Sequence, residues 1–299
     1  MTFQSVEDGT SERNDSSPIN DGFWMRLVTI TLEYFSNKQW YRRLMKSNVD
    51  LFYVSSKLCI RSSFFARLNE ARAMQLVREH TSIPVPKVYC SFIHQGRVVI
   101  LMERLPGKPL SHGWVFRSEE SKAKILAQLR TMIAELRSVP RPSPPPGSPS
   151  NTDLVSGIDG GQFYDGNLPN KQYWGPLATV RDFHRQLRGN LMAVPDEYTE
   201  ERFTDLRKLI ALHESYVAEP PVLTHGDLSA NNILADGDTV TGIIDWETAA
   251  WMPAYWEFTN AWHVNPYNPY WQEEVEKFIE ARPAELDMEK LRRQFFDVF

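Results

Sequence analysis

The chain has 299 residues, 42% of them hydrophobic, which is enough for one large domain or two smaller ones with a substantial core. Its net charge of −5 gives no electrostatic basis for binding nucleic acid. Cys59 and Cys90 are its two cysteines, which excludes a disulfide framework or a cysteine-rich zinc site and favours a reducing compartment, the cytoplasm.

The first 22 residues are acidic, rich in Ser and Asn, and lack the basic-then-apolar order of a secretory signal. We predict a disordered tail there. Residues 23–35 are apolar but contain Arg26 and Glu33, and they fall short of the ~20 apolar residues that a membrane span needs. An amphipathic helix packed on the body of the protein is therefore predicted in preference to membrane attachment.

Four strands and one helix are predicted next, from apolar runs between turn residues and one stretch of helical periodicity. The strands are residues 51–54, 58–60, 88–92 and 97–103, and the helix is residues 68–80. The last strand is nearly all apolar and should be central in a sheet. Because Leu105-Pro106-Gly107 then breaks the pattern, we predict a lobe of residues 23–104 followed by a helical lobe of residues 105–299.

Helices dominate the second part of the chain. Ser118 begins one of them, since Glu119 and Glu120 suit a first helical turn and apolar residues at helical spacing follow. The proline-rich residues 140–150 are predicted to be a surface connection. Further helices are predicted at residues 183–194, 204–216, 270–281 and 288–296.

A turn signal at residues 235–238 separates the apolar runs 232–234 and 240–244 and predicts an antiparallel hairpin. With this turn, Asn232 should lie opposite residue 243, and Asp245 should be its diagonal neighbour at ~7–8 Å. Asp227 precedes them on the loop that enters the first strand. Buried carboxylates are costly unless they are paired or bound to metal, so these side chains need a partner, and one divalent cation could bridge Asn232 and Asp245.

The hairpin carries two motifs. His225-Gly226-Asp227 is followed five residues later by Asn232, and then by Ile243-Ile244-Asp245-Trp246-Glu247. With this pair of motifs the chain resembles the aminoglycoside phosphotransferase and choline kinase family, including its many fungal members, over roughly residues 51–262. The resemblance implies an α+β, two-lobed protein kinase-like fold. Its small lobe would be an antiparallel sheet with one key helix, and its larger, mainly helical lobe would carry the catalytic hairpin.

The same resemblance assigns roles in the helical lobe. Asp227 matches the catalytic aspartate that accepts or orients the proton of an acceptor hydroxyl, and Asn232 and Asp245 match magnesium ligands. His225 would brace the loop. Hard oxygen ligands suit Mg²⁺, and phosphoryl transfer depends mainly on positioning and charge neutralisation.

In the first lobe, Glu70 matches the glutamate that pairs with a phosphate-binding lysine of the sheet. The chain departs from the family here, because Arg61 stands where that lysine is usual, and Lys57 lies four positions earlier. Arginine keeps the charge but is larger and planar, so nucleotide handling could be altered. Residues 45–57 also contain no glycine to cradle phosphates.

The segment around residue 103 matches the hinge between the lobes, whose backbone would meet adenine. The hinge residues assigned to cofactor binding are Met102, Glu103 and Leu105. Side-chain identity matters little for such backbone contacts, and Met102 is equally compatible with a role in the core.

Aromatic residues crowd after Asp245, and core packing is their predicted role. They are Trp246, Trp251, Tyr255, Trp256, Phe258 and Trp262. An aromatic wall for a substrate ammonium is the alternative. Glu247 and Glu257 would suit a basic acceptor in the same way, but structural carboxylates are the default interpretation.

The sequence therefore predicts an enzyme that uses ATP and Mg²⁺ to phosphorylate a hydroxyl of a small molecule. Aminoglycoside-like, choline-like and other amine or sugar acceptors all stay open. A pseudokinase-like binding module is the alternative, motivated by Arg61 and the absent glycine loop. A protein kinase is disfavoured, because Asp245 runs directly into an aromatic region without a long activation segment. Nucleic acid and a membrane span are not expected, and the oligomeric state is not specified.

Overall fold

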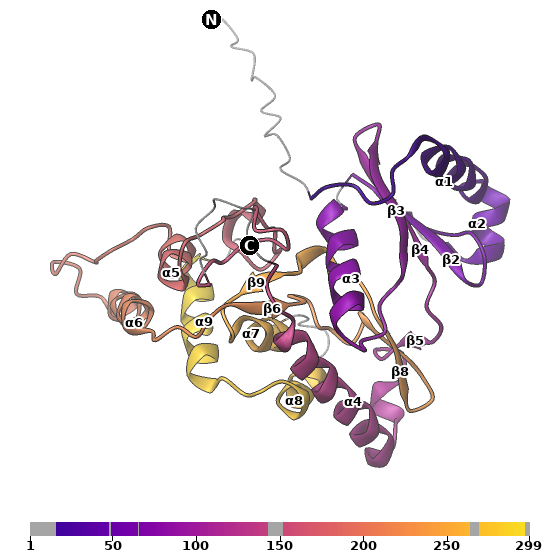
Figure 1. Cartoon of the computed structure of the whole chain (residues 1–299). Helices are drawn as coiled ribbons and strands as arrows, with labels where there is room; N and C mark the ends of the chain where they lie inside the picture. The colour runs from indigo at the N-terminus through magenta and orange to yellow at the C-terminus, as the bar shows by residue number, and fades with distance from the viewer. Residues whose placement is uncertain (1–15, 48, 65, 143–151, 264–268, 297–299) are drawn as a thin grey trace, which may run out of the picture.

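The computed structural model describes residues 16–47, 49–64, 66–142, 152–263 and 269–296. Figure 1 shows a small lobe built around a sheet and a larger lobe that is mostly helical, as the resemblance implied. The small lobe contains α1 (Phe23–Ser36), α2 (Gln39–Met45), β1 (Leu51–Tyr53), β2 (Leu58–Ser63), α3 (Leu68–His80), β3 (Val88–His94) and β4 (Arg97–Glu103).

The helical lobe also holds short strands and 3-10 turns. Its helices are α4 (Glu119–Ser138), α5 (Val180–Leu187), α6 (Glu201–Ser215), α7 (Trp256–His263), α8 (Pro269–Phe278) and α9 (Pro283–Phe296). Its strands are β5 (Lys108–Pro109), β6 (Val222–Thr224), β7 (Ile233–Asp236), β8 (Thr239–Ile243) and β9 (Ala250–Met252). Its 3-10 turns are η1 (Trp114–Phe116), η2 (Pro169–Lys171) and η3 (Trp246–Thr248).

The sheet of the small lobe has the strand order β1-β2-β4-β3, with every pair antiparallel, so the apolar strand β4 is central as predicted. Alternate residues of β4 enter two cores. Ile100 and Met102 belong to the core that includes α3, whereas Val99 and Leu101 belong to a second core on which Met25 and Ile30 of α1 pack. The sheet is therefore covered by α3 on one face and by α1 on the other (Figure 1).

The predicted helix at residues 23–35 is confirmed as α1, and it packs on the sheet through one side, where Thr29 is fully buried. The predicted disordered tail of residues 1–22 needs a correction. Residues 1–15 lie outside the described residues, but residues 16–22 lie against the sheet, where Ile19 and Ser91 exchange backbone hydrogen bonds of 3.1 and 2.8 Å. The backbone groups of β3 thereby gain an additional partner.

Most predicted helices are present. Ser118 caps α4, accepting a hydrogen bond from the Ser121 N–H at 3.2 Å. The helix predicted at 183–194 is instead α5, which begins after the Thr179 cap at Val180 and ends at Leu187. The backbone turns left-handed soon afterwards, at Gly189 and Asn190, which ends the helix earlier than the apolar pattern suggested.

The predicted hairpin forms from β7 and β8, and Ala235 pairs with Val240 as expected, but farther from the turn the register differs by one residue. Ile233 lies opposite Ile243, and the Ile244 N–H donates to the Asn232 carbonyl at 2.9 Å, because an irregularity between Leu234 and Ala235 absorbs one residue. Strand alternation alone would then place Asp245 on the face opposite to Asn232. Asp245 lies beyond the strand with a left-handed φ of 67°, so the alternation does not extend to it.

Five of the six aromatic residues after Asp245 are buried core residues, as predicted. They are Trp246, Trp251, Tyr255, Trp256 and Phe258, and their burial removes them as a wall for a substrate ammonium. Trp262 is half-buried and packs against the same core. Within the described ranges, the structure contains no helix that is both long enough and apolar enough to span a membrane.

Two stacked histidines join α5 to α6. The rings of His184 and His213 lie 4.3 Å apart and are buried, and His213 Nδ1 accepts from Arg188 Nη1 at 3.3 Å. Burial lowers the pKa of His184 to about 4 and that of His213 to about 2. Both folded-state values lie below the ordinary 6.5. The unfolded chain therefore binds more protons, and stability should be lost as the pH falls below about 6.5.

We expect His213→Gln to reduce this acid sensitivity, because glutamine can accept the Arg188 hydrogen bond without titrating. Between pH 7 and pH 4.5 the wild type should lose on the order of 2 kcal/mol through this histidine alone, and the variant should not. Urea unfolding across that pH range measures the difference. His80→Gln, at an exposed position, is the control and should follow the wild type. Equal acid losses in His213→Gln and wild type would contradict the account.

Candidate active site

One buried carboxylate accepts hydrogen bonds from the backbone of the loop between β6 and β7. Glu257, on α7, accepts the backbone N–H of His225 at 2.6 Å and that of Gly226 at 3.1 Å. Gly226 has a left-handed φ of 84°, and a Cβ there would lie 2.9 Å from Thr248 Oγ1. Only glycine therefore fits this position without strain.

His225 braces the same loop against the strand that follows it. Its Nδ1 accepts the Asp227 N–H at 3.2 Å, so its Nε2 carries the proton and donates to the Ile244 carbonyl at 2.9 Å. Burial lowers the pKa of His225 to about 4, which keeps the ring neutral near pH 7. This geometry matches the bracing role expected for His225.

Asp227 and Asn232 are in direct contact. Asn232 Nδ2 donates at 2.9 Å both to the Asp227 carbonyl and to Asp227 Oδ2. Because the amide nitrogen of Asn232 makes both hydrogen bonds, its oxygen Oδ1 is the side-chain atom that could bind a cation. Burial raises the pKa of Asp227 to about 7, and the charge of Asp245 adds to the effect. A carboxylate with a pKa in this range can exchange a proton with a hydroxyl under neutral conditions.

Arg61 contacts three carboxylates from two segments, α3 and the turn after β8. Its Nη1 lies 3.0 Å from Glu70 Oε1 on α3 and 2.6 Å from Asp245 Oδ1, and its Nη2 lies 2.6 Å from Glu247 Oε2. Burial raises the pKa of Glu70 to about 8, against the opposing charge of Arg61. Three acids around one guanidinium leave an excess of negative charge. Glu70 is the most buried of the three and is therefore the one that most readily holds a proton.

Two further contacts fix α3 to the helical lobe. The Arg67 guanidinium carbon lies 3.8 Å from the centre of the Tyr164 ring and 4.5 Å from that of Tyr173, whose hydroxyl it also contacts. Asn69 Nδ2 donates to the Ala249 carbonyl at 2.9 Å in a buried position. Because Glu70 is on this helix, these contacts also fix where its carboxylate lies.

A cleft of about 610 Å³ contains all the residues predicted to hold the nucleotide. Its lining includes Arg61, Glu70, Met102, Glu103, Leu105 and Asp245. Its volume lies within the ~300–1,000 Å³ typical of sites for small molecules and cofactors. The structure thus brings the strand, helix, hinge and hairpin predictions to one cleft, and Asp227 and Asn232 lie on the loop that precedes the hairpin.

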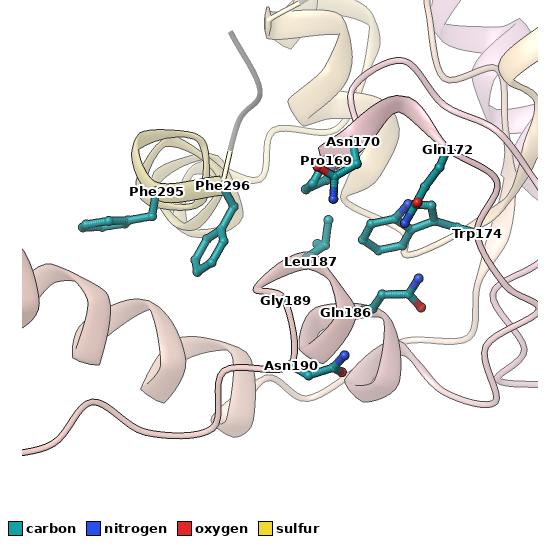
Figure 2. Close-up of a pocket in the computed structure, with 10 residues that line it drawn as sticks. All are labelled: Pro169, Asn170, Gln172, Trp174, Gln186, Leu187, Gly189, Asn190, Phe295 and Phe296. Atoms are coloured by element: carbon teal, nitrogen blue, oxygen red, sulfur yellow. The ribbon is translucent and has the colours of Figure 1, made fainter. Parts of the chain in front are cut away.

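A second hollow, of about 450 Å³, lies in the helical lobe and contains none of the predicted site residues. Figure 2 shows it between α5, the segment around Asn170 and the end of α9, with the Phe296 ring turned toward Leu187 and the Phe295 ring turned away. Amide and aromatic groups line it without any carboxylate. The cleft at Arg61 is therefore the candidate active site.

Residues 61–292 match the phosphotransferase enzyme family, which is well over half of the chain. The chain belongs to this phosphotransferase family. A comparison with curated protein sequences found no match.

Solved structures agree on the fold. The aminoglycoside phosphotransferase APH(4)-Ia is 17% identical with a TM-score of 0.56, and the alignment covers 87% of this phosphotransferase and 88% of that chain. The gentamicin complex of APH(2")-IIa is 16% identical with a TM-score of 0.51, and it covers 86% of each chain. At these identities the likeness establishes the kinase-like fold alone.

Glu247 and Glu257 make structural contacts, in line with their default interpretation, but the partners they contact were not predicted. For Glu247, which contacts Arg61, the position two residues after Asp245 is the signal that could have indicated its partner. Glu257 has no comparable signal, because it reaches the loop only through the packing of α7.

The variant Glu257→Gln tests whether the Glu257 carboxylate stabilises the loop at His225 and Gly226. A glutamine offers one acceptor and one donor group, so one of the two loop N–H groups loses its partner, at a cost of about 1–3 kcal/mol. We expect faster amide hydrogen exchange at His225 and Gly226 and a matching loss of unfolding free energy. Glu274→Gln is the control, since Glu274 is also buried but accepts from the Trp114 side chain. Unchanged exchange at Gly226 would contradict the proposed support.

Proposed function

We propose that this protein is an ATP- and Mg²⁺-dependent phosphotransferase that transfers the γ-phosphate to a hydroxyl of a small molecule. The observation that carries the proposal is the hydrogen bond between Asp227 and Asn232 on a braced loop, together with a cleft that Asp245 lines. Membership of the phosphotransferase family supports the reaction class.

Asp227 is the proposed catalytic residue. Its Oδ2 is oriented by Asn232, and its backbone N–H is bound to His225, so the carboxylate has a defined direction. In the reaction the acceptor oxygen forms a bond to the γ-phosphorus while the bond from that phosphorus to the β,γ-bridging oxygen breaks. Asp227 takes the hydroxyl proton, and ADP leaves with the electron pair of the broken bond.

Asn232 and Asp245 are the residues proposed to hold Mg²⁺. The donor set fits, since it consists of one amide oxygen and one carboxylate, and magnesium usually retains waters and binds phosphate oxygens as well. When bound, the ion would neutralise charge on the phosphates. Arg61 Nη1 contacts Asp245 Oδ1 at 2.6 Å, so we expect a metal ion at Asp245 to displace Arg61 from this oxygen.

Arg61, Glu70 and the hinge are proposed to hold the nucleotide. The backbone N–H groups of Glu103 and Arg104 are bonded to the carbonyls of Lys87 and Lys57, so we expect the Leu105 N–H to meet the base edge. Arg61 is positioned by Glu70, and once it leaves Asp245 its guanidinium can face phosphate oxygens. A neighbouring solved structure is a ternary complex with AMP-PNP and hygromycin B, which supports an ATP-type donor and a small-molecule acceptor.

The proposed acceptor is an amine or sugar metabolite that carries a hydroxyl, of the aminoglycoside-like or choline-like kind. Glu247 and Glu257 are both occupied, by Arg61 and by the loop backbone, and so do not themselves select a cationic acceptor. ATP and reduced thiols are both supplied by the cytoplasm, which is the proposed location.

A nucleotide-binding module with weak or no catalysis is the second candidate. The observation that favours it is the 2.6 Å contact between Arg61 and Asp245, which occupies the proposed metal ligand.

Asp227→Asn should lower turnover by about 10²–10⁴-fold while leaving the affinity for Mg·ATP within about twofold of wild type. The acceptor is first found by a thermal-shift screen with Mg·ATP and then with amines and amino sugars, and turnover is followed as ADP release. Asp236→Asn, at an exposed position beside the hairpin turn, is the control and should retain full activity. Absence of both Mg·ATP binding and turnover across the panel would refute the proposed function.

Arg61→Lys distinguishes the two candidates. A single ammonium cannot hold Glu70 and Glu247 together as the planar guanidinium does, so we expect affinity for Mg·ATP to fall about tenfold, equivalent to one charged hydrogen bond. Titration calorimetry measures this. Arg97→Lys, on the neighbouring strand β4, is the control and should bind as the wild type. A large gain in affinity for Arg61→Lys would instead favour a degraded site and the binding module.

A further inference from the structure

The helix pair α1 and α2 carries an apolar surface on the side that does not touch the sheet. Six large side chains make up this surface, which we call the outer face, and each is 46–73% exposed: Trp24, Leu27, Val28, Phe35, Trp40 and Leu44. The spacing of the first four places them on one side of α1, because residues three, four and seven apart in a helix share a face. Isolated exposed apolar residues are ordinary, but a contiguous set indicates an interaction site.

The opposite side of α1 already has its partner. Met25 and Ile30 pack on the sheet, and Thr29 is buried with its hydroxyl 3.4 Å from Cys90 Sγ. The helix is therefore apolar on both sides, and the sheet covers only one of them. In Figure 1 α1 and α2 form the outer end of the small lobe, on the sheet face opposite α3. The outer face consequently lies apart from the residues of the catalytic cleft.

Positive charge gathers beside the outer face. Residues 37–47, which include α2, contain four basic residues and no acidic residue, in a chain whose net charge is −5. Arg42, Arg43 and Lys46, all near the end of α2, line a hollow of about 440 Å³. The Arg42 guanidinium is steadied there by the Asn37 side chain, at 3.4 Å, and by the Phe52 ring, at 5.6 Å.

We propose that the outer face and this basic hollow bind the surface of an anionic phospholipid membrane. Trp24, Leu27 and Trp40 would enter the boundary between headgroups and acyl chains, and Arg43 and Lys46 would meet lipid phosphates. Aromatic and aliphatic side chains on one side with Lys and Arg beside them are the composition of helices that lie in the membrane interface. With 14 residues, α1 is about 21 Å long. It is therefore too short to cross a hydrocarbon core of ~30 Å, but it can lie along the membrane surface.

Charge favours a lipid surface over a second copy of the chain. A two-fold partner would bring an identical set of basic side chains toward the first, without supplying acids to pair with them. An anionic membrane supplies both the apolar phase for the outer face and phosphates for Arg43 and Lys46. This inference is independent of the proposed phosphotransferase reaction, because it uses none of the cleft residues.

Vesicle co-sedimentation of the full chain tests the proposal. The protein should bind vesicles that contain phosphatidylserine and not vesicles of phosphatidylcholine alone, and binding should weaken as salt shortens the Debye length from ~10 Å at 0.1 M to ~3 Å at 1 M. The double variant Trp24→Ser/Trp40→Ser should lose binding. Arg43→Glu/Lys46→Glu should also lose it, since each basic residue near an anionic surface contributes roughly a factor of five in affinity.

Matched variants separate these effects from general changes in surface character. Phe116→Ser/Val217→Ser removes two side chains that are 90% and 88% exposed elsewhere, and Lys124→Glu/Lys208→Glu reverses two exposed charges on the helical lobe. Both controls should bind vesicles like the wild type. Failure of the wild type to bind, or equal binding by all variants, would overturn the proposal. So would a dimer, measured by light scattering, that Trp24→Ser/Trp40→Ser converts to a monomer, because the face would then belong to a second copy.

Discussion

One half-buried arginine connects the two lobes of this protein. Arg61 extends from β2 to Glu70 on α3, and to Asp245 and Glu247 beyond β8, so the sheet, the helix and the hairpin meet at one guanidinium. A buried charge is tolerated only when it is well paired, and here the pairing draws residues from both lobes into a single cluster. Burial raises the pKa of Glu70, and the negative charges of Asp245 and Glu247 add to the effect.

The loop that carries Asp227 is organised separately from that cluster. Glu257 binds its backbone, His225 connects it to the hairpin, and Asn232 orients Asp227, so hydrogen bonds within the protein define the shape of the loop. Such preorganisation is the main contribution that a protein can make to phosphoryl transfer. The alternation of side chains along β4 then divides the small lobe, with α3 and the cleft on one face and α1 with its outer face on the other.

Sequence patterns predicted the features that repeat locally. The helix at residues 68–80 and the strand at residues 97–103 have the observed bounds, because their periodicity reflects one buried face or a fully buried strand. The hairpin register was right at Ala235 and Val240 but off by one residue at Asn232, since turn chemistry does not reveal the irregularity between Leu234 and Ala235. The contact of Glu257 with His225 spans 32 residues and depends on how α7 packs, which no local pattern encodes.

The most direct test of this account is a crystal structure of the protein with Mn²⁺ in place of Mg²⁺ and a non-hydrolysable ATP analogue, read from the anomalous signal of manganese. The account predicts a manganese peak bound by Asn232 Oδ1 and the Asp245 carboxylate, with Arg61 withdrawn from Asp245 toward the phosphates. A nucleotide bound without metal at these residues, and with the 2.6 Å contact between Arg61 and Asp245 intact, would contradict it.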